Sequence, residues 1–440
     1  MAAPHPRLRK HLSTPGLLKT IRQSFEAIAD HRHQRSQISL ADALMAGLAV
    51  FGLKYPSLLK FDEAYRDGVI RHNLKTLYGV ERAPCDTQLR TILDAVDPHP
   101  LRSAFRAVHR HLQRGKAVEA YQYLDGHYLL SLDGTGQFAS SAIRCAECCV
   151  KTSHGQESYY HQLLGAVLVH PELPTVLPLA PEAITRQDGA TKNDCERNTA
   201  KRLLVQLRHE FPKLKLIVVE DSLAANGPHL ELLHELDLRY IIGVKEGDHE
   251  ALFAAVRTKL QAGEGTEFSY TNAHGIEQGY RFVNDLPLNH THPQRRVNFL
   301  EYWENKGESQ LQLSWITDIE LSQDNVERIM RGGRARWKIE NETFNTLKNQ
   351  GYNLEHNYGH GQQHLATVLG FLMMLAFLVD QVQELGCRLW QAARAHFRSR
   401  TSLWERLRVL FTGFYIPDWK TLWEAVATGH VPTVLAPDSS

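Results

Sequence analysis

The chain has 440 residues, of which 43% are apolar and 22% are charged, and its net charge is +1. These values are normal for a globular protein, and they exclude a largely disordered or membrane-embedded chain. The length exceeds that of one ordinary domain.

The charge is distributed unevenly. Residues 1–120 carry 19 Lys and Arg against 11 Asp and Glu, whereas the remainder carries 31 against 38. A basic N-terminal part followed by a mildly acidic remainder is typical of a DNA-binding arm attached to another domain. The six cysteines are scattered apart from one cluster, and the longest apolar runs (43–53 and 368–379) are shorter than the roughly 20 residues of a membrane span. We therefore expect reduced thiols, two buried helices and a cytoplasmic protein.

Residues 1–118 are predicted to form a helical, DNA-binding region. Ser39 is placed to cap a helix that ends near Leu53, and a second helical stretch covers 61–77. Asp86 can cap a short helix that stops before Pro98. This order resembles a helix-turn-helix with Gln88, Arg90 and Thr91 facing a groove, and a plain helical bundle is the alternative.

From residue 121 the period changes to that of strands. Apolar segments at 128–132, 159–170 and 176–184 are followed by a helix that Asn193 and Glu196 can cap, and then by strands at 216–219 and 239–244. Three strands, helix, strand, helix, strand is the order of the ribonuclease H-like fold. Asp133 and Asp221 are each predicted to close a strand of this core, which covers 119–250.

Residues 251–311 read as a β-rich insertion, because they combine short strand-like runs with turns and little helical period. The core is predicted to resume over 312–385, with a helix from about residue 324 to Lys348 that carries Glu340. Residues 386–440 are expected to form a helical C-terminal region. The predicted fold class is therefore α/β, with an interrupted ribonuclease H-like core between two helical regions.

Three carboxylates from two strands and one helix can hold two divalent cations, which is the arrangement of phosphoryl-transfer sites. Glu342 lies roughly 200° from Glu340 on a helix, so Glu340 is the one that shares a face with Arg336. An ordinary ion pair between Arg336 and Glu340 on an exposed face is the alternative.

The segments DGTG at 133–136, VVEDS at 218–222 and RWKIENETFNTLK at 336–348 resemble bacterial insertion-sequence transposases of the DDE class. These enzymes share a Tyr-x2-Arg-x3-Glu-x6-Lys signature and a β-rich insertion before the catalytic Glu. The resemblance covers about residues 120–385. It departs from the signature at two positions, because Gly333 stands where the Tyr is expected and the Lys falls one residue late, at Lys348.

The resemblance implies that Asp133, Asp221 and Glu340 are catalytic and bind two Mg²⁺ ions, for which Mn²⁺ can substitute. It implies that Arg336, Lys338 and Lys348 contact DNA. The implied partners are double-stranded DNA, as terminal inverted repeats and target, and a second copy of the chain on paired ends. The implied reaction is hydrolytic nicking followed by strand transfer. A structure-specific nuclease or resolvase and an inactive DNA-binding regulator are the alternatives.

Two weaker patterns concern metal ligands. Cys145, Cys148 and Cys149, with His154 nearby, have a zinc-like spacing, but a second close ligand pair is absent and a reduced cysteine cluster is favoured. His356, His360 and His364 are predicted to lie in a turn, because glycines flank His360, and to form hydrogen bonds or approach DNA phosphate, with metal binding as the alternative. Trp303 and Trp315 are assigned to packing, with base stacking as the alternative.

Overall fold

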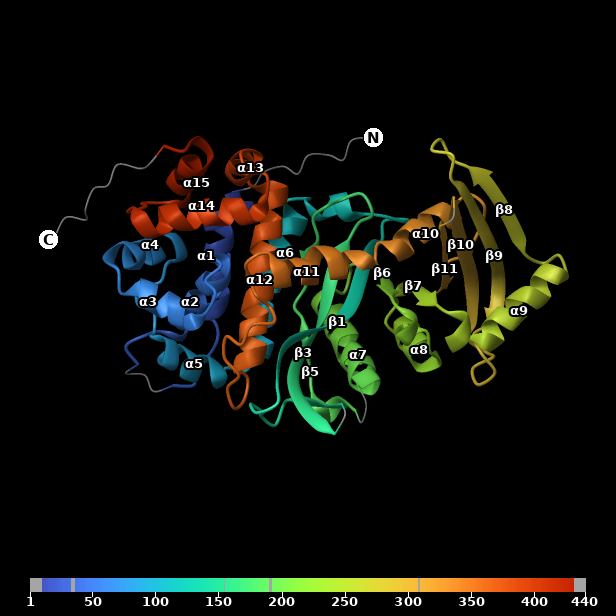
Figure 1. The fold of residues 1–440 in the computed structure, drawn as a ribbon, viewed down its shortest axis with the longest axis horizontal. Coiled ribbons are helices and arrows are strands. Elements are labelled where there is room, and N and C mark those ends of the chain that lie inside the picture. Colours follow the sequence, from blue (N-terminus) through green and yellow to red (C-terminus); the bar gives the residue numbers. More distant parts are fainter. Residues whose placement is uncertain (1–9, 33–35, 154, 190–191, 308, 431–440) are drawn as a thin grey trace.

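The protein has a mixed α/β fold in which a single large sheet adjoins a body of helices (Figure 1). A computed structural model describes residues 10–32, 36–153, 155–189, 192–307 and 309–430. The helices of the body come from both ends of the chain. They are α1 (Thr14–Glu26), α2 (Leu40–Gly52), α3 (Leu58–Tyr65), α4 (Gly68–Tyr78), α5 (Asp86–Asp94), α6 (Arg102–Arg114), α12 (Leu365–Gly386), α13 (Arg388–Ala395), α14 (Arg400–Gly413) and α15 (Trp419–Thr428).

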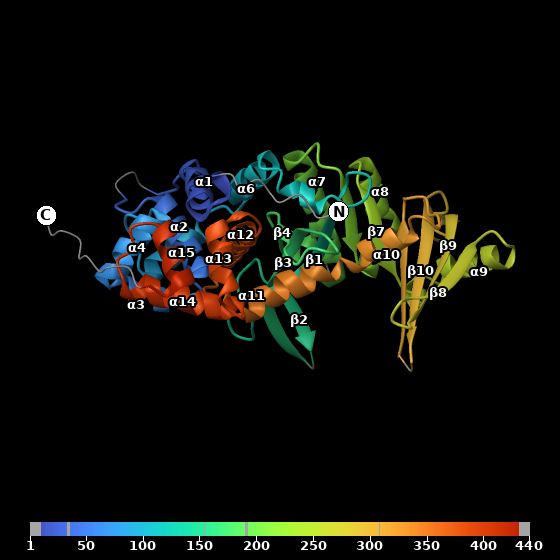
Figure 2. The same ribbon diagram turned by 90° about the horizontal axis from the view of Figure 1, so that it is seen from above.

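Contacts across the body join helices from the two halves of the chain, and α4 lies beside α14 in both views (Figures 1 and 2). The Asn73 side chain donates a hydrogen bond to the carbonyl of Phe411 at 2.6 Å, and the Trp419 indole donates to the carbonyl of Leu77 at 2.8 Å. The predicted N-terminal region therefore does not stand apart from the C-terminal helices.

Helix α5 is joined to the start of α12. Asp94 accepts hydrogen bonds from four successive backbone amides, at residues 362–365, and so caps that helix from outside. The residue at the N-cap of α5 is Cys85, so the prediction of Asp86 as the cap is wrong by one residue. Gln88 and Thr91 are exposed, while Arg90 pairs with Asp86 at 2.7 Å. A DNA-reading role for this helix stays a prediction.

Helix α12 is long and apolar enough to cross a membrane, judged by length and composition only. Its most apolar window is 89% buried inside the protein. The helix packs against α2, which is nearly as apolar and begins where Ser39 accepts a hydrogen bond from the amide of Asp42. The prediction that both apolar runs form buried helices is confirmed.

The sheet has the strand order β2-β3-β1-β6-β7-β11-β10-β9-β8, with β4 and β5 also paired to β3. Strand β6 is parallel to β1, so the strand that carries Asp133 and the strand that precedes Asp221 are neighbours, as predicted. The strands are β1 (Tyr128–Ser140), β2 (Cys149–Ser153), β3 (Gln156–Val169), β4 (Leu177–Pro178), β5 (Glu182–Ile184), β6 (Leu216–Glu220), β7 (Arg239–Val244), β8 (Thr266–Thr271), β9 (Glu277–Pro287), β10 (Arg296–Lys306) and β11 (Ser309–Thr317).

Helices cover both faces of the central strands. Figure 2 shows α7 (Lys192–Glu210) and α8 (Gly227–Glu235) on one side and α10 (Val326–Arg334) and α11 (Asn345–Asn349) on the other. All five residues of β6 are buried, which is typical of a strand covered on both faces.

The segment 251–311 differs from its prediction at its start, where α9 (Glu250–Gln261) forms a regular helix. Its strands do not form a separate sheet. They extend the central sheet through the antiparallel pairing of β11 with β7, and then of β10 with β11.

Candidate active site

Asp133 lies within a strand and not at its end. Strand β1 continues to Ser140, and Asp133 pairs with Gly165 of β3 in the antiparallel ladder. The prediction that Asp133 closes the first core strand is therefore wrong, because β3 is long enough to pair with the chain beyond it. Asp133 Oδ1 accepts a hydrogen bond from the amide of Gly134 at 2.8 Å.

Asp221 follows the last residue of β6, as predicted, and caps the short helical turn Ser222–Ala224. Its Oδ1 accepts a hydrogen bond from the amide of Leu223 at 2.9 Å. The parallel register pairs Ser131 with Val219, and two further steps along both strands bring Asp133 and Asp221 to the same level. Asp133 on β1 therefore lies beside Asp221, which directly follows the neighbouring strand β6.

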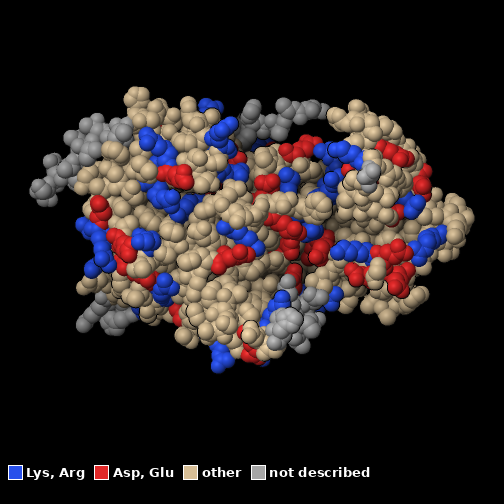
Figure 3. All heavy atoms as spheres, viewed as in Figure 1, with Lys and Arg blue, Asp and Glu red and all other residues tan. Residues whose placement is uncertain are grey.

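Glu340 is linked to Asp133 by the side chain of Arg336. Arg336 Nη1 lies 2.7 Å from Glu340 Oε1 and 3.3 Å from Asp133 Oδ2, so one guanidinium bridges carboxylates more than 200 residues apart. The expected i,i+4 ion pair exists, but it is not an isolated surface pair, because the Arg336 side chain is only 16% exposed and also contacts Asp133. Figure 3 shows acidic side chains gathered in the middle of this face, around the helical segment that leads into α11.

A fourth carboxylate, Glu196 of α7, adjoins Asp133. A Cβ built on Gly134 would lie 3.1 Å from the Glu196 carboxylate, so the glycine permits this close approach. Sequence reasoning assigned Glu196 to a helix cap and missed this position. Its signal was the glycine after Asp133, which indicates that another group comes close to the strand.

The electrostatics of the site centre on Asp133. Burial raises the pKa of Asp133 to about 7, the charges of Glu340, Glu196 and Asp221 add to the rise, and Arg336 opposes it. A buried carboxyl group surrounded by other carboxylates attracts a cation, because a positive charge offsets both the desolvation and the repulsion.

The helix that carries Glu340 contains a π-helical segment, Ile339–Phe344. Such a segment acts like a one-residue insertion in an α-helix, because its backbone hydrogen bonds join residues five apart in the sequence instead of four. It therefore rotates the following residues by about 100°. Lys348 thus takes the direction that residue 347 would have on a regular helix, and Leu347 is fully buried instead. This accounts for the shifted lysine in the sequence.

The missing Tyr at Gly333 also has a structural reason. A Cβ at Gly333 would overlap the indole ring of Trp315, which is buried against this helix. The assignment of Trp315 to packing therefore agrees with its burial. Trp303 lies beneath Arg281, whose guanidinium is 5.6 Å from its ring centroid.

A groove runs from Asp221 along the helix that carries Glu340. Its lining includes Lys245, Arg334, Arg336 and Trp337, and Trp337 is 44% exposed. Basic and aromatic side chains in one groove suit a nucleic-acid strand. Lys338 does not line this groove, since its Nζ donates a hydrogen bond to the carbonyl of Leu173 at 2.8 Å. Lys348 Nζ pairs with the exposed Glu355 at 2.7 Å.

The carboxylates do not form one closed metal cage in the described residues. Within the described residues, the oxygens of Asp133, Asp221 and Glu340 do not all lie within 4.8 Å of one another. Two ions about 4 Å apart need a more open set of ligands. Arg336 Nη1 already places positive charge between Asp133 and Glu340. Oxygen ligands of this kind suit Mg²⁺ or Mn²⁺.

The raised pKa of Asp133 predicts a pH dependence of stability in the absence of metal. Its folded pKa of about 7 exceeds the value of about 3.9 for an unfolded Asp, so its contribution to stability is present below pH 4 and is lost as the pH rises to about 7. We expect this loss to be absent in Asp133→Asn, and Mg²⁺ to raise the wild-type denaturation midpoint more at pH 8 than at pH 6. Denaturant titrations with EDTA or Mg²⁺ measure both. Identical pH profiles for the two proteins would contradict the assignment.

Comparisons with known proteins leave the family open. No family model and no curated protein matches the chain. Among solved structures, the chain is similar to piggyBac transposase in a cryo-EM synaptic complex with hairpin DNA, at 11% identity and a TM-score of 0.42, over 96% of this chain and 81% of that one. This degree of similarity assigns neither a family nor an activity to the chain.

Proposed function

We propose that the protein is a DDE transposase of a bacterial insertion sequence, which cuts and joins DNA at the ends of its element. The observation that carries the proposal is the proximity of Asp133, Asp221 and Glu340. Asp133 lies on β1, Asp221 directly follows the neighbouring parallel strand β6, and Glu340 is linked to Asp133 by Arg336. These are the three residues that the sequence resemblance marks as catalytic. We place the protein in the cytoplasm, as a homodimer on paired DNA ends.

The strand order supports a ribonuclease H-like core. Strand β3 lies antiparallel between β1 and the short strands β4 and β5, while β6 and β7 follow on the other side of β1 in parallel. This is the order that the fold requires. The strands β8–β11 then lengthen the sheet at the far edge.

Asp133, Asp221 and Glu340 would hold the two cations, with Glu196 next to them. Divalent cations bound there would activate a water nucleophile and neutralise the leaving oxygen. Asp133 would act as a ligand in its ionised form. Arg336, which contacts Asp133 and Glu340, is placed to contact the scissile phosphate. Arg334, Lys245 and Trp337 position the strand in the groove.

The test is an assay with the full-length protein, Mg²⁺ and linear DNA that carries the inverted repeats flanking its gene. Cleavage at the repeat followed by joining to a second DNA supports the proposal. Cleavage without joining identifies a nuclease or resolvase of the same fold. End binding without cleavage identifies a DNA-binding regulator, and no specific interaction with the ends contradicts all three.

Lys348 is expected to contact a DNA phosphate, because the π-helical segment turns it outward. Lys348→Ala should weaken DNA binding about equally for all sequences and reduce the slope of log affinity against log salt by about one. Lys338→Ala is the matched comparison and should change the slope less, because its ammonium group is bonded to the Leu173 carbonyl. Fluorescence anisotropy at several salt concentrations measures both. Equal slopes for wild type and Lys348→Ala would remove Lys348 from the interface.

A further inference from the structure

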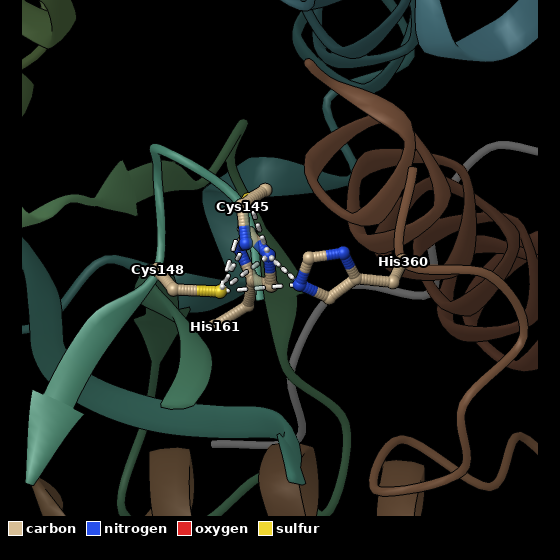
Figure 4. Close-up of side chains that lie close together, drawn as sticks. All are labelled: Cys145, Cys148, His161 and His360. Carbon is tan, nitrogen blue, oxygen red and sulfur yellow. Dashed lines mark hydrogen bonds between the residues drawn. The ribbon is translucent and has the colours of Figure 1, made fainter. Parts of the chain in front are cut away.

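A second cluster of metal-ligand side chains lies away from the carboxylates. Cys145, Cys148, His161 and His360 converge so that their ligand atoms all lie within 4.8 Å of one another (Figure 4). Cys145 and Cys148 lie in the loop between β1 and β2, His161 lies on β3, and His360 lies in the loop between α11 and α12. Three of the four side chains are buried and Cys145 is half-buried.

The spacing of the ligand atoms matches a tetrahedral zinc site. With Zn–S of about 2.3 Å and Zn–N of about 2.0 Å, neighbouring ligands of a tetrahedral ion lie about 3.3 to 3.8 Å apart. The two sulfurs are 3.7 Å apart, and His161 Nε2 lies 3.5 and 3.6 Å from Cys145 Sγ and Cys148 Sγ. His360 Nε2 lies 3.1 Å from Cys148 Sγ and 3.2 Å from His161 Nε2. Binding of an ion at the centre would therefore require only small shifts of the four side chains.

The surrounding hydrogen bonds prepare these groups as ligands. His360 Nδ1 donates to the carbonyl of Gly361 at 2.9 Å, which leaves the lone pair of Nε2 directed at the cluster. The amide of Cys145 donates a hydrogen bond to Cys148 Sγ at 3.4 Å, a contact that a metal-bound sulfur can also accept. Cys149, the first residue of β2, does not join the cluster, since its thiol donates to the carbonyl of Ile184. His154 lies outside the described residues.

We infer that Cys145, Cys148, His161 and His360 bind one structural Zn²⁺ ion. Two thiolates and two neutral imidazoles balance the charge of the ion, which suits a buried position. All four positions are taken by protein, as in structural rather than catalytic zinc sites. This corrects the expectation of a plain cysteine cluster, since the missing second ligand pair comes from His161 and from His360, which is 212 residues from Cys148.

The ion would hold the loop between α11 and α12, which follows the helix with Glu340, against the sheet that contains Asp133. His360 lies between α11 and α12, and His161 lies on β3, the antiparallel partner of β1. The inference does not depend on the proposed DNA chemistry, because it rests on different residues.

The first test is the metal content of full-length protein purified without chelators, measured by mass spectrometry. We expect about one zinc per chain in the wild type, and less than about a tenth of that in Cys148→Ser and His360→Ala. Cys149→Ser and His356→Ala are matched controls, a neighbouring cysteine and a histidine of the same loop, and should keep the metal. A wild type without zinc, or full zinc in His360→Ala, overturns the site.

A second measurement separates loss of the site from loss of the fold. Protein produced with Co²⁺ in place of zinc should show the visible bands of tetrahedral cobalt and a thiolate charge-transfer band. The charge-transfer band should be lost in Cys145→Ser, as the metal is in Cys148→Ser, while circular dichroism stays unchanged. Removal of the metal from the wild type should also increase proteolysis within 350–364. An octahedral cobalt spectrum without a thiolate band overturns the assignment.

Discussion

Asp133→Asn, Asp221→Asn and Glu340→Gln should each lower the rate of Mg²⁺-dependent DNA cleavage by about a thousandfold or more, which corresponds to about 4 kcal/mol of transition-state stabilisation. Each change keeps the shape of the side chain and removes a charge that the cations require. Cleavage of end-bearing DNA under single-turnover conditions measures the effect.

Glu342→Gln is the matched control, because Glu342 lies on the same π-helical segment but points to a different side. It should retain activity close to the wild type. Asp133→Asn should also retain or increase the denaturation midpoint in EDTA, since it removes a buried charge. If Asp133→Asn is folded and inactive, the loss of activity is therefore caused by the missing carboxylate and not by unfolding. Equal losses in Glu342→Gln and Glu340→Gln would contradict the choice of Glu340.

Asp380→Ala should lower the free energy of unfolding by about 3 to 5 kcal/mol, because it leaves the buried ammonium group of Lys54 without its partner. Lys54 Nζ lies 2.7 Å from Asp380 Oδ2, and the Tyr352 hydroxyl also donates to this carboxylate. Burial lowers the pKa of Lys54 and raises that of Asp380, while the attraction between them opposes both shifts. The pair joins the turn after α2 to α12 inside the helical body.

The double variant Lys54→Met with Asp380→Leu supplies the control. It removes both charges together and should be markedly more stable than either single variant. Chemical denaturation followed by circular dichroism compares the four proteins. If Asp380→Ala unfolds at the wild-type denaturant concentration, the pair is not buried as the structure has it.

Local features of the site followed from the sequence. The apolar run before Asp221 and the helical phase of Arg336 with Glu340 depend on short-range patterns, and the structure has both. The neighbouring position of β1 and β6 was expected from the order of elements along the chain, and the structure has it as well. The turn around His360 was also predictable, because its flanking glycines disfavour a helix.

Features that depend on distant contacts were not predictable. Glu196 approaches Asp133 only because α7 packs over the sheet, and no local pattern gives that distance. His161 and His360 come from separate elements, so the ligand spacing of a linear zinc motif is absent. The only sign of the π-helical segment in the sequence was Lys348, one residue later than the signature lysine.

The most direct test of the proposed active site is the position of bound Mn²⁺, located by anomalous scattering in crystals of the protein with end DNA. We expect two ions about 4 Å apart, with ligand oxygens from Asp133, Asp221 and Glu340 at about 2.2 Å, and Arg336 displaced toward a phosphate. Mn²⁺ bound elsewhere, with the Arg336 bridge between Asp133 and Glu340 intact in the DNA complex, would contradict the account.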